Sequence, residues 1–143
     1  MQYVCDAPER KTWFRIETEG EAAAESESMK HAVEKYFRRE HEKAVQAYRP
    51  ASSNFIERDI GLNAHIQRAM PWFLTLRDHE GNPLATAMLP PGGKDDGSFR
   101  TIVVGPANAD PYPAQEPAIA ALGKHLGLTL DRERCFPYQR YGV

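Results

Sequence analysis

The stretch from Trp72 to Leu89 constrains the fold of this chain more than any other part of the sequence. Two apolar runs flank a polar segment, Arg77 to Pro83, that contains a glycine and an asparagine. This pattern is typical of an antiparallel β-hairpin closed by a loop of several residues. It predicts an antiparallel sheet packed against a helix, which is the arrangement of an α+β domain.

Three further segments have the composition of strands. They are Tyr3–Cys5, Thr12–Ile16 and Phe99–Val104. Their aromatic and β-branched side chains favour extended structure. Together with the hairpin, they predict an antiparallel sheet of four or five strands.

Residues 21–48 contain neither proline nor glycine and predict one long helix. Acidic residues gather near its start and basic residues in its second half, which suits the helix dipole. We expect the apolar stripe of this helix to pack on the sheet face that carries Leu74 and Leu76. The stripe consists of Met29, Val33, Tyr36, Phe37 and Ala44.

Residues 55–70 fit two interpretations. Apolar residues alternate there as in a strand, yet Leu62 and Ile66 also fit one face of a helix. We favour a short helix that Asp59 caps and that Pro71 ends.

The C-terminal third is rich in proline. Residues 107–117 contain three prolines and predict an extended surface loop. Residues 118–126 predict a short helix, and Gly127 supplies its C-cap. The chain is then a single α+β domain, residues 1–143, that ends in an extended tail at residues 132–143.

The composition is that of an ordinary globular domain, with 41% hydrophobic and 27% charged residues. A formal net charge of −2 argues against a protein that binds nucleic acid through bulk positive charge. The sequence contains no apolar run long enough to span a membrane, and its start has no basic and apolar secretory signal. We therefore expect a cytoplasmic protein.

The sequence gives no reason to expect a metal or a cofactor. No two of the five histidines lie three or four residues apart, and none accompanies a cysteine pair at zinc spacing. Gly93-Lys94 superficially matches a phosphate-binding loop, but two aspartates follow it, and their charge would repel phosphate.

Glu40 is the charged residue that helical spacing places in the centre of the predicted apolar stripe, between Tyr36 and Ala44. A buried carboxylate is costly unless it is paired. Either the helix leaves the core before residue 40, or Glu40 is paired inside the fold. In the second case Glu40 and its neighbour His41 are the catalytic candidates of an enzyme with a dispersed active site.

Basic residues in the second half of the predicted helix support a third hypothesis, a nucleic-acid-directed module. These residues are Lys35, Arg38, Arg39 and Lys43. Acidic residues interrupt them, so a solvated helix face is the favoured interpretation.

The C-terminal tail combines arginine with aromatic side chains, which are enriched at interface hot spots. The candidates for contact with a partner are Arg134, Tyr138, Arg140 and Tyr141. Since the sequence contains no recognisable catalytic or cofactor-binding motif, the favoured hypothesis is a small binding or regulatory protein that acts through a protein–protein surface. The expected partner is another protein, and the sequence leaves the oligomeric state open.

Overall fold

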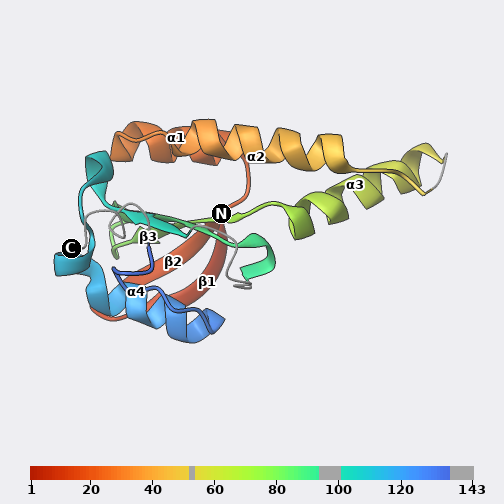
Figure 1. Ribbon diagram of the computed structural model, residues 1–143. Helices are drawn as coiled ribbons and strands as arrows, with labels where there is room; N and C mark the ends of the chain where they lie inside the picture. The colour runs from red at the N-terminus through yellow and green to blue at the C-terminus, as the bar shows by residue number, and fades with distance from the viewer. Residues whose placement is uncertain (52–53, 94–100, 136–143) are drawn as a thin grey trace.

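The structure is a computed structural model that describes residues 1–51, 54–93 and 101–135 (Figure 1). Within these ranges, five strands form one antiparallel sheet in the order in which they follow along the chain. They are β1 (Gln2–Ala7), β2 (Lys11–Ile16), β3 (Trp72–Arg77), β4 (Pro83–Leu89) and β5 (Ile102–Val104). The predicted α+β class and the predicted sheet are thereby confirmed.

The hairpin between β3 and β4 closes around Asp78. The Oδ1 atom of Asp78 accepts hydrogen bonds from the backbone N–H groups of Glu80 and Asn82, each 2.9 Å long. Its Oδ2 atom accepts a third from the Asn82 side chain at 3.1 Å. The hydrogen bonds from Asn82 lower the pKa of Asp78. Such side-chain-to-backbone bonds make aspartate a strong turn residue, and they fix the hairpin loop that the sequence predicts.

In the described part of the chain, four α-helices accompany the sheet. They are α1 (Glu19–Met29), α2 (Val33–Ala47), α3 (Phe55–Ala69) and α4 (Tyr112–Leu126). Helices α1 and α2 cover one face of the sheet and α4 covers the other (Figure 1). Two short 3₁₀ segments, η1 (Pro91–Gly93) and η2 (Pro106–Asn108), flank β5.

The prediction of one long helix over residues 21–48 was wrong, because the helix is interrupted at residues 30–32. Lys30 adopts the left-handed conformation, with φ of 56° and ψ of 52°, and ends α1. The hydroxyl of Ser26 then accepts a hydrogen bond from the backbone N–H of Glu34 at 2.8 Å, in the first turn of α2. The interruption shifts the angular phase of every later residue relative to Met29.

The expected packing face was also wrong. Phe37 of α2 packs against Phe73, with 5.3 Å between the ring centroids, so the α1–α2 layer covers the Phe73 side of the sheet. Leu74 and Leu76 face α4 on the opposite side and are completely buried there. Of the predicted stripe, Tyr36 is exposed and the other four residues are buried.

Helix α4 is longer than expected and includes most of the predicted loop. Pro113 lies in its first turn, where the backbone N–H that proline lacks would have no helical partner. Pro117 is tolerated inside the helix. On the sheet side, the indole N–H of Trp13 donates a buried hydrogen bond to the carbonyl oxygen of Ala118 at 2.8 Å, which fixes α4 on β2.

In the described part of the tail, residues 132–134 form a turn, and Arg132 pairs with Asp110 at 2.9 Å. Tyr138, Arg140 and Tyr141 lie outside the described residues. None of the described helices is long and apolar enough to cross a membrane.

Candidate functional site

Helices α2 and α3 form an antiparallel pair that extends beyond the sheet (Figure 1). We call residues 41–51 and 54–69 of this pair the arm. Asn54 starts α3, because its side-chain oxygen accepts hydrogen bonds from the backbone N–H groups of Ile56 and Glu57 at 3.0 and 3.1 Å. The helical interpretation of residues 55–70 is thus confirmed, with Asn54 as the cap in place of Asp59.

The arm exposes large apolar side chains. Phe55 is 75% exposed, Ile56 68% and Ile60 64%. No residue of α3, all of which the structure describes, is buried. Burying a side chain of this kind is worth about 1.5–3 kcal/mol relative to leaving it in water. A partner that covered these side chains would therefore gain binding free energy from their burial.

Two of these residues belong to a regular series along α3. The series consists of Ile56, Ile60, Asn63 and Gln67, all of them exposed, and we call it the α3 stripe. The steps of four, three and four residues keep these side chains on one side of the helix, as along the contact line of two packed helices. The α3 stripe therefore has the spacing of a helix-packing surface.

The stripe runs from the tip of the arm to a groove at its root. The groove has a volume of about 140 Å³, and its lining includes Asn63 and Gln67 from α3, His41 from α2, and Arg15 and Glu17 at the end of β2. It is the polar end of a surface whose other end is apolar.

Charged residues flank the apolar end of the stripe. Arg58 and Asp59 are both exposed, and within the described ranges neither forms an ion pair. A partner surface could therefore pair with one charge of each sign here.

The attachment of α3 to α2 is thin. The Tyr48 and His65 rings pack with 5.5 Å between their centroids. Gly61 lets the Tyr48 side chain approach the α3 backbone, because a Cβ at this position would overlap the Tyr48 hydroxyl.

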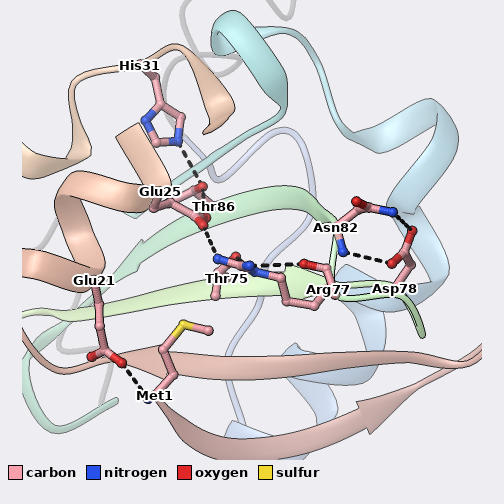
Figure 2. A network of polar contacts seen from close by, with 10 residues as sticks. Met1, Glu21, Glu25, His31, Thr75, Arg77, Asp78, Asn82 and Thr86 are labelled. Carbon is pink, nitrogen blue, oxygen red and sulfur yellow. Dashed lines mark hydrogen bonds and ion pairs between the residues drawn. The ribbon is translucent and has the colours of Figure 1, made fainter. Parts of the chain in front are cut away.

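A second notable constellation is the buried polar network inside the body of the molecule (Figure 2). Glu25 of α1 is completely buried. Its Oε1 accepts a hydrogen bond from the Arg77 guanidinium at 2.7 Å, and its Oε2 accepts one from the Thr86 hydroxyl at 2.6 Å. His31 Nε2 lies 2.8 Å from the same hydroxyl. The network connects the α1–α2 junction to β3 and β4.

Helical spacing in α1 is a sequence signal for this network. Ala22, Glu25 and Met29 lie three and four residues apart, so Glu25 falls on the buried side of α1. The same spacing argument fails for Glu40, because the interruption at residues 30–32 changes its angular position relative to Met29.

The structure places the catalytic candidates, Glu40 and His41, on α2 and outside the buried polar network. The side chain of Glu40 is 20% exposed and lies 3.6 Å from the Lys43 ammonium group. His41 is exposed and stacks beside Phe37 with 6.5 Å between the ring centroids. Among the described residues, neither Glu40 nor His41 bonds to the buried network, and His41 lines the groove at the root of the arm.

The basic residues of α2 are solvent-exposed and partly neutralised. Arg38 pairs with Glu19 and Glu34 at 2.7 Å each, and Lys43 lies beside Glu40. Arg39 stacks over the Tyr36 ring. Local pairing leaves less free positive charge for phosphate than the four basic residues suggest.

Of the predicted contact residues in the tail, Arg134 is described and is exposed. Within the described part of the chain, no group of three or more histidine, cysteine, aspartate or glutamate side chains could hold a metal ion. Comparison of the chain with family models, curated proteins and solved structures gives no match. The surfaces described above are therefore the basis on which a function can be proposed.

Proposed function

We propose that this protein is a binding or regulatory protein that docks another protein through the α3 stripe. The observation that carries the proposal is the exposure of Phe55, Ile56 and Ile60 on a helix without a buried residue. Contiguous exposed apolar surface with a polar rim is typical of protein interaction sites. The surface thus replaces the C-terminal tail as the main docking site of the proposal.

The partner is a helix that lies along α3. Its apolar residues cover Ile56 and Ile60, and its polar side chains meet the amides of Asn63 and Gln67. Arg58 and Asp59 at the edge select a partner that carries an acidic and a basic residue at matching positions. This mode corresponds to the packing of an amphipathic helix on an exposed helical surface.

A second copy of the chain fits the stripe poorly. Two copies of α3 in antiparallel, full-length contact would place the isoleucines of one copy opposite Asn63 and Gln67 of the other. That arrangement buries amide groups against apolar side chains, which is costly. Parallel contact would bring two bodies to the same end of the helix pair. A different protein therefore suits the stripe better than a homodimer.

A photo-crosslinking amino acid at position 60, in cells of the source organism, tests the proposal. We expect a discrete adduct with a second protein, and no adduct from the same amino acid at the exposed Lys124 position of α4. The substitution Ile56→Asp should reduce adduct formation about tenfold or more, since it removes one buried apolar side chain from the interface.

Two results would overturn the proposal. Equal labelling from positions 60 and 124 would show that the stripe has no specific partner. An adduct of twice the mass of the chain would assign the stripe to self-association.

A further inference from the structure

A cavity of about 280 Å³ lies at the junction of α1 and α2, where it faces β4 and β5. Its apolar lining includes Phe73, Met88, Ile102 and Val104. The cavity lies near the N-terminal end of α2, whereas the arm contains the C-terminal end of the same helix. It is therefore separate from the proposed docking surface.

One wall of the cavity is polar and fixed. His31 and Thr86 line it, and the hydrogen bond between them continues to the buried carboxylate of Glu25 (Figure 2). The backbone N–H of Val33 points at His31 Nδ1 at 3.4 Å, so this nitrogen is the acceptor and the proton is assigned to Nε2. Burial also lowers the pKa of His31. The wall is therefore a neutral imidazole in a defined orientation.

Two other polar side chains on the lining make no hydrogen bond with the described residues. They are the Tyr36 hydroxyl and the Asn108 carboxamide. Asn108 follows β5 in the η2 turn, where it and Ala107 both have positive φ, 60° and 55°. Residues other than glycine, asparagine and aspartate rarely adopt this backbone conformation. The unusual backbone conformation of this turn thus places the Asn108 side chain on the lining of the cavity.

The lining also restricts the charge of a ligand. Of the described residues that form it, none has an ionised side chain at neutral pH. The nearest buried charge, Glu25, is covered by Thr86 and paired with Arg77. An ion in the cavity would lose its hydration without gaining a counter-charge, which is unfavourable.

We propose that this cavity binds a small, uncharged molecule that has an apolar body and a hydroxyl or carbonyl group. The apolar body contacts Met88, Ile102 and Val104, and the polar group bonds to Asn108 and Tyr36. The volume accommodates roughly nine water-sized groups, which corresponds to a fused two-ring compound. Apolar walls with a few polar groups that orient the ligand are typical of small-molecule sites.

The test compares 2-naphthol with 2-naphthoate, which share a ring system but differ in charge at pH 7. Titration followed by ¹H–¹⁵N correlation spectra measures both affinity and location. We expect saturable binding of 2-naphthol with a Kd below about 1 mM and shifts that centre on residues 31–36 and 102–108. The anion should bind at least about tenfold more weakly.

Three variants locate the site. Ile102→Trp fills the cavity and should abolish binding, whereas Lys124→Trp adds the same side chain to exposed α4 and should leave binding unchanged. Asn108→Gly retains the left-handed backbone and removes the carboxamide, so it should weaken binding several-fold. The dispersion of each free spectrum reports whether the variant is folded.

Three results would overturn the inference. They are the absence of saturable 2-naphthol binding, equal affinity for the anion, and unchanged binding to a folded Ile102→Trp variant.

Discussion

Glu25 is the residue on which the interior of the α1–α2 layer depends. Its carboxylate is completely buried, and two partners from β3 and β4 compensate its charge. Replacement of a whole buried ion pair by apolar residues is often nearly neutral, but removal of one partner leaves an uncompensated charge. The network therefore contributes less net stability than its geometry suggests, while it penalises any rearrangement that separates α1 from the sheet.

A comparison of two arginines tests this view of the network. Arg77 and Arg38 each form a 2.7 Å ion pair, but their side chains are 19% and 50% exposed. We predict that Arg77→Met lowers the free energy of unfolding by about 3–5 kcal/mol, because it leaves the buried carboxylate of Glu25 without a counter-charge. Arg38→Met should cost less than about 1 kcal/mol. Urea denaturation measures both, and similar losses for the two variants would contradict the buried role of Glu25.

His31 should make stability depend on pH. Burial lowers its pKa in the folded state below the ordinary value of 6.5. Below pH 6.5 the unfolded chain therefore binds more protons than the folded chain, and stability falls as the pH decreases toward the folded pKa. Above pH 6.5 this contribution is complete.

The variant His31→Gln should flatten the dependence of the unfolding free energy on pH between 7 and 5. The matched variant His79→Gln, in the exposed hairpin loop, should retain the slope of the unmodified chain. Parallel slopes for the two variants would show that His31 does not titrate differently in the folded and unfolded states.

At the scale of single elements, features that depend on neighbouring residues could be predicted from the sequence. Features that depend on tertiary contacts could not. The β3–β4 hairpin follows from turn residues within a few positions, and Asp78 confirms how that turn closes. The interruption at residues 30–32 contains Lys, His and Ala, none of which breaks helices strongly. It accompanies contacts distant in sequence, above all the one between His31 and Thr86, which no local pattern reveals.

For helix α4 the sequence predicts too little helix, whereas for residues 21–48 it predicts too much. The three prolines of residues 107–117 predict a loop when they are only counted, although proline is compatible with the first turn of a helix. Apolar contacts of Ile119 and Leu122 with the sheet stabilise the remainder. A count of prolines without their positions relative to the helix start misjudges such a segment.

Helix α3 should be the least stable of the regular elements in the isolated protein. It has the same length as α4, fifteen residues, but no buried side chain, whereas five residues of α4 are buried. We predict that backbone amides of α3 exchange with deuterium at least about tenfold faster than those of α4. Equal protection of the two helices would show that the thin contact with α2 suffices to hold α3.

At the scale of the whole molecule, a body with a buried core on each face of the sheet carries an extended arm. The sheet separates two apolar cores, one under α1 and α2 and one under α4, and this two-sided arrangement fixes the body. The class of the fold could be predicted from the sequence. The face of the hairpin that packs against α1 and α2 was predicted wrongly, because both faces of β3 are apolar enough to be buried. The arm and its stripe could not be predicted, since exposure depends on where α3 is attached.

Our central proposal is that the exposed stripe of α3 is the docking site for another protein. The most direct test is the size of the protein in native extracts of source cells, compared with the double variant Ile56→Ser/Ile60→Ser. We predict that the unmodified chain migrates in a complex above its own mass of 16.1 kDa, and that the double variant migrates as a folded monomer. Unfolding curves of the purified chains should agree within about 0.5 kcal/mol, because the substituted positions are exposed. A double variant that remains in the same complex would contradict the claim.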